Sequence, residues 1–126
     1  YLRLGSVDQV LRRTYRGSGP AGGNCMSLEV HLGIAGDIAA GISFLHRTGI
    51  VHRDLAARNV LVKEEGGSFM CKIGDFGTAR KLNDRGLYLS HDPAEFLAYK
   101  WCAPEVFVRQ EFSPAADMFA YGVTLW

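Results

Sequence analysis

The sequence has no strong excess of charge of either sign. Its 126 residues include 14 lysines and arginines and 13 aspartates and glutamates, which gives a formal net charge of +1. Nucleic acids and anionic membranes recruit proteins through clustered basic residues, whereas the basic residues here are scattered along the chain. We therefore expect neither a nucleic acid nor a membrane surface among the partners of this segment.

Long apolar runs and signal-peptide patterns are also missing. A membrane-spanning helix needs about 20 mostly apolar residues, and the longest apolar stretch, residues 27–46, is interrupted by Asp37. Internal repeats and low-complexity segments are absent as well. A chain of this length can bury roughly two thirds of its unfolded surface, so we expect a single packed unit.

Cysteine is scarce. The sequence contains only Cys25, Cys71 and Cys102. Their number is odd and their spacing matches no metal-ligand pattern. Because disulfides are rare in reducing compartments, the simplest interpretation is three free thiols in such a compartment.

Residues 50–62 contain a short polar loop that lies between two apolar segments. It holds five side chains that carry charge or strong hydrogen-bonding groups, namely His52, Arg53, Asp54, Arg58 and Asn59. Polar groups enclosed by apolar segments are costly unless they hydrogen-bond one another or bind a ligand. The pattern therefore predicts a functional loop.

A second loop repeats this arrangement a few residues later. The run 72–77, Lys-Ile-Gly-Asp-Phe-Gly, places Asp75 at the end of a predicted short strand. Hard cations prefer oxygen ligands, and acidic and amide side chains from the two loops could hold one. In this interpretation Asn59 and Asp75 bind the metal, while Asp54 stays free to accept a proton.

Two helices are predicted before the polar loop. Ser6 and Gln9 form a capping-box pattern ahead of a short amphipathic helix that we expect to end at residues 12–13. Apolar residues recur at three- and four-residue spacing over 27–46, which predicts a buried helix of about five turns. We expect its glycines to mark close approach to a neighbouring helix, and Asp37 to face solvent or to pair locally.

After the polar loop, the pattern predicts a β-hairpin with strands at 60–62 and 69–73 and a turn at 64–68. Residues 75–105 are predicted to be mostly irregular, and such a long loop inside a compact domain is usually functional. From Pro114 onward the chain is apolar almost all round, which predicts a central buried helix.

Three ordered motifs run through these loops. Residues 52–59 follow the pattern H-R-D-L-x-x-x-N, residues 75–77 are D-F-G and residues 103–105 are A-P-E. Together they resemble the catalytic segment of protein kinases. Two further features are similar to those of tyrosine kinases. They are the residues Ala-Ala-Arg at 56–58, which occupy the variable positions of the first motif, and the Lys-Trp pair at 100–101.

The resemblance implies an α+β, protein-kinase-like fold. We expect a mainly helical fragment of the C-terminal lobe, with a short β-hairpin beside the catalytic loop. Within a partial kinase domain at 1–126, residues 1–6 correspond to the hinge between the lobes and residues 7–126 to the first part of the C-terminal lobe. The N-terminal lobe and the end of the C-terminal lobe are then expected to be absent from this chain.

For the reaction, the resemblance implies ATP and Mg²⁺ as cofactors. Asp54 matches the catalytic base, which orients the substrate hydroxyl and accepts its proton. Arg58 matches an arginine that reaches back toward that base, and a purely structural ion pair is the alternative. Asn59 and Asp75 match the magnesium ligands.

The resemblance also assigns residues to nucleotide binding and to regulation. Leu2 matches the hinge residue that bonds the adenine edge, and Leu61 matches the floor of the adenine pocket; ordinary core packing is the alternative for both. Arg53 matches the arginine that receives the phosphate of an activated segment. The expected partner of Arg53 is Tyr88, which would be an autophosphorylation site. The alternative is that Tyr88 is an unmodified aromatic residue of the loop.

Two further positions match structural residues of the family, and two depart from its pattern. His52 is expected to pack beneath Phe76 and to hydrogen-bond backbone, and Asp117 matches a buried helix residue that holds the catalytic-loop backbone. Thr78 stands where leucine usually follows the D-F-G glycine. Ala98 occupies a place where tyrosine kinases commonly have proline.

The function implied is a protein-tyrosine kinase that transfers the γ-phosphate of ATP to tyrosine hydroxyls of protein or peptide substrates. The implied location is cytoplasmic, as a cytosolic kinase or as the intracellular domain of a receptor. Without a Gly-rich loop and a phosphate-binding lysine, the chain is not expected to catalyse by itself. The alternatives are a pseudokinase that acts as a binding or scaffolding module, a serine/threonine or dual-specificity kinase, and a small-molecule phosphotransferase.

Overall fold

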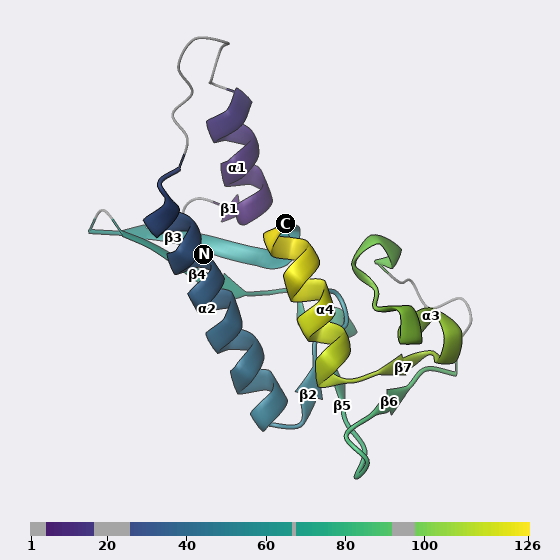
Figure 1. Cartoon of the computed structure of the whole chain (residues 1–126). Helices are drawn as coiled ribbons and strands as arrows, with labels where there is room; N and C mark the ends of the chain where they lie inside the picture. Colours follow the sequence, from purple (N-terminus) through teal and green to yellow (C-terminus); the bar gives the residue numbers. More distant parts are fainter. Residues whose placement is uncertain (1–4, 17–25, 67, 92–97) are drawn as a thin grey trace.

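The computed structural model describes residues 5–16, 26–66, 68–91 and 98–126 (Figure 1). In these residues the chain forms two long helices, two shorter ones and three small antiparallel sheets. This mixture of helices and small sheets agrees with the predicted α+β class.

The first strand and helix begin with a reciprocal cap. Strand β1 (Gly5–Ser6) leads directly into helix α1 (Val7–Arg16). The hydroxyl of Ser6 accepts the backbone N–H of Gln9 at 3.4 Å, and Gln9 Oε1 accepts the N–H of Ser6 at 3.2 Å. The capping box is therefore confirmed. The helix continues past the predicted end at 12–13, because basic residues extend into its last turn and suit the negative end of the helix dipole.

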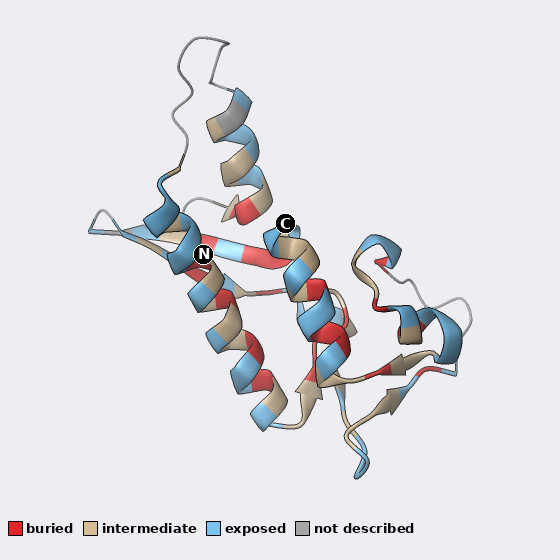
Figure 2. Ribbon diagram, in the orientation of Figure 1, coloured by how far each residue is buried: buried red, intermediate tan, exposed pale blue. Residues whose placement is uncertain are grey.

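Helix α2 (Leu28–Arg47) is the longest helix of the described chain. The hydroxyl of Ser27 caps it by accepting the N–H of Val30 at 3.3 Å. Its buried face, seen as red segments in Figure 2, consists of Ile34, Ile38, Ile42 and Leu45. The helix predicted over 27–46 is thus confirmed with a shift of one residue, but its predicted burial is only partly correct, since Leu28 and Leu32 are exposed.

A three-stranded sheet lies against α2. Strands β3 (Val60–Glu65) and β4 (Ser68–Ile73) form the predicted hairpin, with Val60 opposite Ile73. Both strands extend into the turn predicted at 64–68, where Glu65 pairs with Ser68. Strand β1 pairs with the other edge of β3, where Ser6 lies opposite Leu61. Because the polar loop ends where β3 begins, the hairpin fixes the end of that loop.

Two expectations about α2 are wrong. Asp37 pairs at long range, because its Oδ2 accepts the backbone N–H of Cys71 in β4 at 2.6 Å. The close approach at Gly41 involves a strand rather than a helix. A Cβ at Gly41 would lie 2.9 Å from Cδ1 of Ile73 in β4.

By length and composition alone, α2 could cross a membrane, contrary to the argument from its single aspartate. It has 20 residues and a mean hydropathy of 1.4. A core helix meets the same two criteria, and α2 packs against β4 and against helix α4 (Pro114–Leu125). In the described structure 22% of the apolar window of α2 is buried, and the absence of membrane contact stays a prediction.

The segment predicted to be mostly irregular contains short strands. Strand β2 (Ile50–Val51) pairs with β5 (Arg80–Lys81), and β6 (Tyr88–Leu89) pairs with β7 (Glu111–Phe112). Because β2 leads directly into the polar loop, its pairing with β5 ties the segment after Asp75 to that loop.

Helix α4 differs from the prediction that it is buried all round. It follows a short helix, α3 (Pro104–Arg109), and the side chain of Ser113 caps it. Its buried residues all lie in its first two turns and are Ala116, Asp117 and Ala120. Met118 is 48% exposed and Trp126 is fully exposed. In the described part of the chain, α4 therefore buries one face only.

Two apolar clusters enclose the polar loop. The first gathers residues from α1, α2, β3 and β4, and the second joins β2 to α3, β7 and α4. Val51, before the loop, belongs to the second cluster, whereas Leu55 and Val60 belong to the first. The loop backbone is thus held from both sides by packing.

Candidate active site

Asp54 is held by two neighbours in its own loop. Arg58 donates from Nη2 to Oδ1 of Asp54. Asn59 donates from Nδ2 to Asp54 Oδ2 at 2.8 Å and to the Asp54 carbonyl oxygen at 2.7 Å. A single 3-10 turn over Ala57–Asn59 carries both partners. The structure therefore brings Asp54, Arg58 and Asn59 together.

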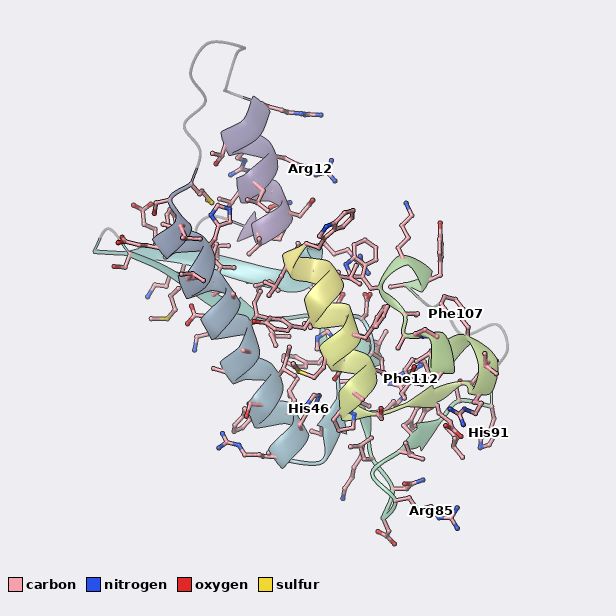
Figure 3. All side chains as sticks on the ribbon, viewed as in Figure 1. Arg12, His46, Arg85, His91, Phe107 and Phe112 are labelled. Atoms are coloured by element: carbon pink, nitrogen blue, oxygen red, sulfur yellow. The ribbon has the colours of Figure 1, made fainter. Side chains whose placement is uncertain are left out.

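The backbone just before Asp54 is fixed from helix α4. Asp117, only 3% exposed, accepts the N–H of His52 at 2.8 Å and the N–H of Arg53 at 3.0 Å. Arg53 has a φ of 72°, a left-handed conformation that is unfavourable for a residue with a side chain. Asp117 thus stabilises a strained turn, as predicted from sequence. His46, which is labelled in Figure 3, comes from the end of α2. Its Nε2 lies 2.9 Å from the same carboxylate.

The loop that carries Asp75 is joined to the first loop through the residue before it. The N–H of Gly74 donates to the carbonyl oxygen of Asn59 at 2.8 Å. The Gly74 carbonyl oxygen accepts from His52 Nε2 at 2.9 Å. Asp75 itself is exposed, with a left-handed φ of 56°, and its Oδ1 accepts the N–H of Gly77 at 3.4 Å. Asp75 is therefore accessible to solvent, and the residue before it is bonded to the backbone of Asn59.

The oxygen atoms offered here suit a hard cation. Because Asn59 donates through Nδ2, its Oδ1 is the atom left to face a ligand, and Asp75 offers a carboxylate. Two such ligands fit Mg²⁺, which usually keeps several waters and binds substrate phosphates. Among the residues the structure describes, no group of three or more His, Cys, Asp and Glu side chains could hold a metal. A bound Mg²⁺ would therefore depend on phosphate oxygens as well.

Of the two predicted nucleotide-binding residues, one can be placed. Leu61 lies on β3 with its side chain 38% exposed. It packs beside Gly74, since a Cβ at Gly74 would lie 3.1 Å from Leu61 Cδ1. Leu61 is thus next to the loop of Asp75. Leu2 lies outside the described residues.

The two predicted regulatory residues are in contact. The guanidinium carbon of Arg53 lies 4.8 Å from the ring centroid of Tyr88 and 4.2 Å from that of Phe112. The two rings are themselves 6.2 Å apart. These distances are typical of cation–π contacts, which gain strength when the cation is desolvated, and Arg53 is buried.

Arg58 has an aromatic neighbour as well as its carboxylate partner. Its guanidinium carbon lies 4.9 Å from the ring centroid of Trp101, in the 3-10 turn Tyr99–Trp101. The next residue, Cys102, is partly buried. Burial and the negative charge of Asp54 raise the pKa of its thiol, and the positive charge of Arg53 opposes that rise.

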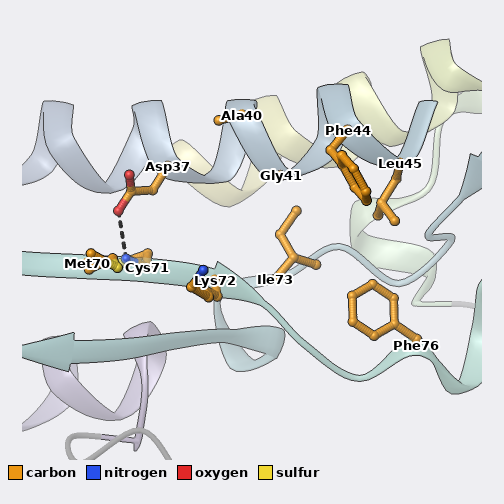
Figure 4. Close-up of a pocket in the computed structure, with 10 residues that line it drawn as sticks. All are labelled: Asp37, Ala40, Gly41, Phe44, Leu45, Met70, Cys71, Lys72, Ile73 and Phe76. Carbon is orange, nitrogen blue, oxygen red and sulfur yellow. Dashed lines mark hydrogen bonds between the residues drawn. The ribbon is translucent and has the colours of Figure 1, made fainter. Parts of the chain in front are cut away.

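A pocket of about 430 Å³ adjoins the site between α2 and β4 (Figure 4). Phe76 lies at one end of it, and its ring meets that of His52 edge-on, with centroids 5.5 Å apart. The expected contact between His52 and Phe76 is confirmed. Cys71 also lines the pocket, where burial and the charge of Asp37 raise its pKa to about 11. That thiol stays protonated at neutral pH and is a poor nucleophile.

None of the predicted site residues that the structure describes lines the pocket of Figure 4. Sequence reasoning also missed the contacts of Phe112 and the stacking of Trp101 on Arg58. Phe112 carries no local signal, because only the pairing of β6 with β7 brings it to Arg53. For Trp101, the Lys-Trp pair at 100–101 is the sequence signal that points to it.

Comparison with known proteins places the chain in a family. All of it, residues 1–126, matches the family model described as protein tyrosine and serine/threonine kinase. Protein-tyrosine kinase 6 of Homo sapiens is 44% identical over 94 residues, which cover 75% of this chain and 20% of that protein. Ephrin type-A receptor 6 of Rattus norvegicus is 34% identical over 126 residues, covering 100% of this chain and 11% of that protein.

A third relative, tyrosine protein-kinase src-1 of Caenorhabditis elegans, is 36% identical over 127 residues, covering 100% of this chain and 22% of that protein. The chain belongs to the protein tyrosine and serine/threonine kinase family. The family implies a protein-kinase-like fold, and the observed helices and small sheets are consistent with it. The chain spans between 11% and 22% of the length of these three relatives.

Proposed function

We propose that this chain is part of the catalytic domain of a protein-tyrosine kinase that uses ATP and Mg²⁺. The observation that carries the proposal is the joining of two polar loops around Asp54. Its carboxylate is oriented by Arg58 and Asn59, and the residue before Asp75 is hydrogen-bonded to Asn59. Positioning and charge neutralisation are what phosphoryl transfer requires of a protein.

In the proposed reaction, Asp54 orients a tyrosine hydroxyl and accepts its proton as the phenol oxygen bonds to the γ-phosphorus. The bond between that phosphorus and the leaving oxygen of ADP breaks in the same transfer. Bound Mg²⁺ would neutralise charge on the phosphate oxygens, with Asn59 and Asp75 as its protein ligands. Arg58, stacked on Trp101, keeps the carboxylate of Asp54 from rotating away.

The nucleotide is proposed to lie over β3 and beside the loop of Asp75. The exposed side chain of Leu61 forms the floor under the adenine, and residues 1–6 form the hinge. Pairing of Ser6 with Leu61 supports this placement, because it brings the chain that follows Leu2 next to the proposed floor. Residues 7–126 are then the first part of the C-terminal lobe.

Tyr88 and Arg53 are proposed as a regulatory pair. Their contact in the unmodified protein supports the assignment, since phosphate added to that ring would appear close to a buried guanidinium. A phosphate adds roughly −1.5 to −2 charge and accepts bidentate hydrogen bonds from arginine. Proposed substrates are proteins or peptides with an accessible tyrosine, and the proposed location is the cytoplasm.

The test uses the complete kinase domain that contains this chain, supplied with ATP and Mg²⁺. We expect it to phosphorylate a poly-Glu/Tyr substrate and not a serine- and threonine-containing peptide. Asp54→Asn keeps the size of the side chain but removes the proton acceptor. It should lower kcat by about 10²- to 10⁴-fold.

The matched control is Asp8→Asn, which removes an exposed carboxylate that pairs with Arg12 on α1. It should leave kcat unchanged. Retained activity in Asp54→Asn would remove Asp54 from its role. Phosphorylation of the serine and threonine peptide would reject tyrosine specificity, and an inactive wild type that still binds partners would favour a pseudokinase.

A further inference from the structure

The loop that carries Asp75 is anchored on both sides, not only at Gly74. Asp75 precedes a 3-10 turn over Phe76–Thr78. At the end of that turn, the hydroxyl of Thr78 donates to the carbonyl oxygen of His52 at 2.9 Å. The carbonyl oxygen of Thr78 in turn accepts from Arg53 Nη1 at 3.2 Å. Three residues, Asp75 to Gly77, thus lie between two anchors.

Both anchors end on the loop that contains Asp54. Gly74 is bonded to Asn59 and His52, and Thr78 is bonded to His52 and Arg53. Three of these four bonds use backbone groups of the Asp75 loop. The fourth needs a hydroxyl side chain, because the carbonyl oxygen of His52 can only accept, and His52 is fully buried.

We infer that Thr78 is a positioning residue for the proposed phosphoryl-transfer site. Its hydroxyl holds the carboxylate of Asp75 in a fixed position relative to Asn59. The inference rests on the proposed function, because it assigns Asp75 and Asn59 to one metal–nucleotide complex. Asp75 is exposed and its own backbone is in a left-handed conformation, so nothing in its immediate turn fixes its place as firmly as the two anchors do. Leucine at position 78 could not supply this bond.

The consequence is a specific loss of metal-dependent binding when the hydroxyl is removed. A loop that samples several placements is competent to bind in only a fraction of them, and its apparent affinity falls by that fraction. A single hydrogen bond of ordinary net strength corresponds to a change of about 3- to 10-fold. ATP bound without Mg²⁺ does not use Asp75 as a metal ligand, so its affinity should not change.

The experiment measures ATP binding by calorimetry in the complete kinase domain, once with Mg²⁺ and once with a chelator. Thr78→Val keeps the branched shape and removes the hydroxyl. We expect it to weaken ATP binding about 3- to 10-fold in Mg²⁺ and to leave binding in chelator unchanged. Thr78→Ser keeps the hydroxyl and should bind like the wild type. Thr78→Ala takes the place of the valine variant if that protein does not fold.

The matched control is Thr48→Val, which removes a similar bond from a threonine hydroxyl to the carbonyl oxygen of Leu45 at 2.8 Å, at the end of α2. It should bind ATP normally in both conditions. Equal binding by wild type and by the Thr78 variants that lack the hydroxyl, or equal weakening with and without Mg²⁺, would overturn the inference and leave the proposed function standing. A wild type with no Mg²⁺-dependent ATP binding would overturn both.

Discussion

At the scale of single residues, the contact between Arg53 and Tyr88 sets up a test of regulation. Tyr88 is half-buried against Arg53 and Phe112, whereas Tyr99 is 65% exposed. After incubation of the complete domain with ATP and Mg²⁺, we expect mass spectrometry to find phosphate on Tyr88 in preference to Tyr99. The reason is that, of these two tyrosines, Tyr88 is the one with the buried Arg53 in place to receive the new charge.

The variants for this test separate charge from geometry. Arg53→Lys keeps a positive charge but cannot make bidentate contacts, so phosphorylation of Tyr88 should raise kcat less than in the wild type. Tyr121, whose hydroxyl donates to the carbonyl oxygen of Ala35 at 3.0 Å, is an internal control that should stay unmodified. Phosphate on Tyr99 with Tyr88 untouched, in an active sample, contradicts the assignment.

Much of the polar loop could be predicted residue by residue. That Asp54, Arg58 and Asn59 contact one another follows from their closeness in sequence, because a single turn suffices to bring them together. The contact of Asp37 with Cys71 and that of Arg53 with Phe112 could not be predicted in the same way. Cys71 and Phe112 reach them only through strand pairing and helix packing, which leave no local pattern.

At the scale of elements, two of the three glycines of α2, Gly36 and Gly41, make a matched pair. A Cβ added at Gly36 meets nothing within 4 Å, whereas one at Gly41 would lie 2.9 Å from Cδ1 of Ile73. Alanine is favoured over glycine inside a helix by up to about 1 kcal/mol. Gly36→Ala should therefore raise the free energy of unfolding by about 0.5–1 kcal/mol.

Gly41→Ala should not show that gain in full. The added Cβ would force Cδ1 of Ile73 to move, and this shift offsets the gain in helix propensity, so the free energy of unfolding should rise less than in Gly36→Ala. Urea denaturation of the complete domain measures both variants. Equal stabilisation by the two substitutions would show that Ile73 yields without cost and that the helix–strand contact is loose.

The long helix and the hairpin were predictable as elements because each has a clear period and a clear cap or turn. Helix α4 was predictable in position but not in burial. Its apolar composition suggested burial on all sides, yet only Ala116, Asp117 and Ala120 are buried in the described structure. The composition of a helix shows which of its faces are apolar enough to be buried. The packing of the surrounding elements decides which of those faces are buried. The short strands β2, β5, β6 and β7 have two residues each and are too short to show a period.

At the scale of the whole molecule, Asp117 joins the last helix to the loop of Asp54. Its buried carboxylate accepts two backbone N–H groups and lies beside His46 from the end of α2. Asp117→Asn keeps the shape but replaces one acceptor oxygen by a donor nitrogen. Because hydrogen bonds to charged groups contribute about 1.5–3 kcal/mol each, the free energy of unfolding should fall by about that much.

The same substitution on the surface provides the control for Asp117. Asp8→Asn disrupts only an exposed ion pair and should change stability by less than about 0.5 kcal/mol. Urea denaturation again gives the comparison. If the free energy of unfolding falls by the same small amount in both variants, the carboxylate of Asp117 is not what stabilises the left-handed turn at Arg53.

The anchoring of that turn by a distant helix has a consequence for protein engineering. Grafting residues 50–78 onto another scaffold would transfer every motif residue of the two polar loops. It would not transfer the acceptor that keeps Arg53 at a positive φ, since Asp117 arrives from the far end of the chain. A successful transplant must therefore bring its own buried carboxylate, placed under the two N–H groups that precede Asp54.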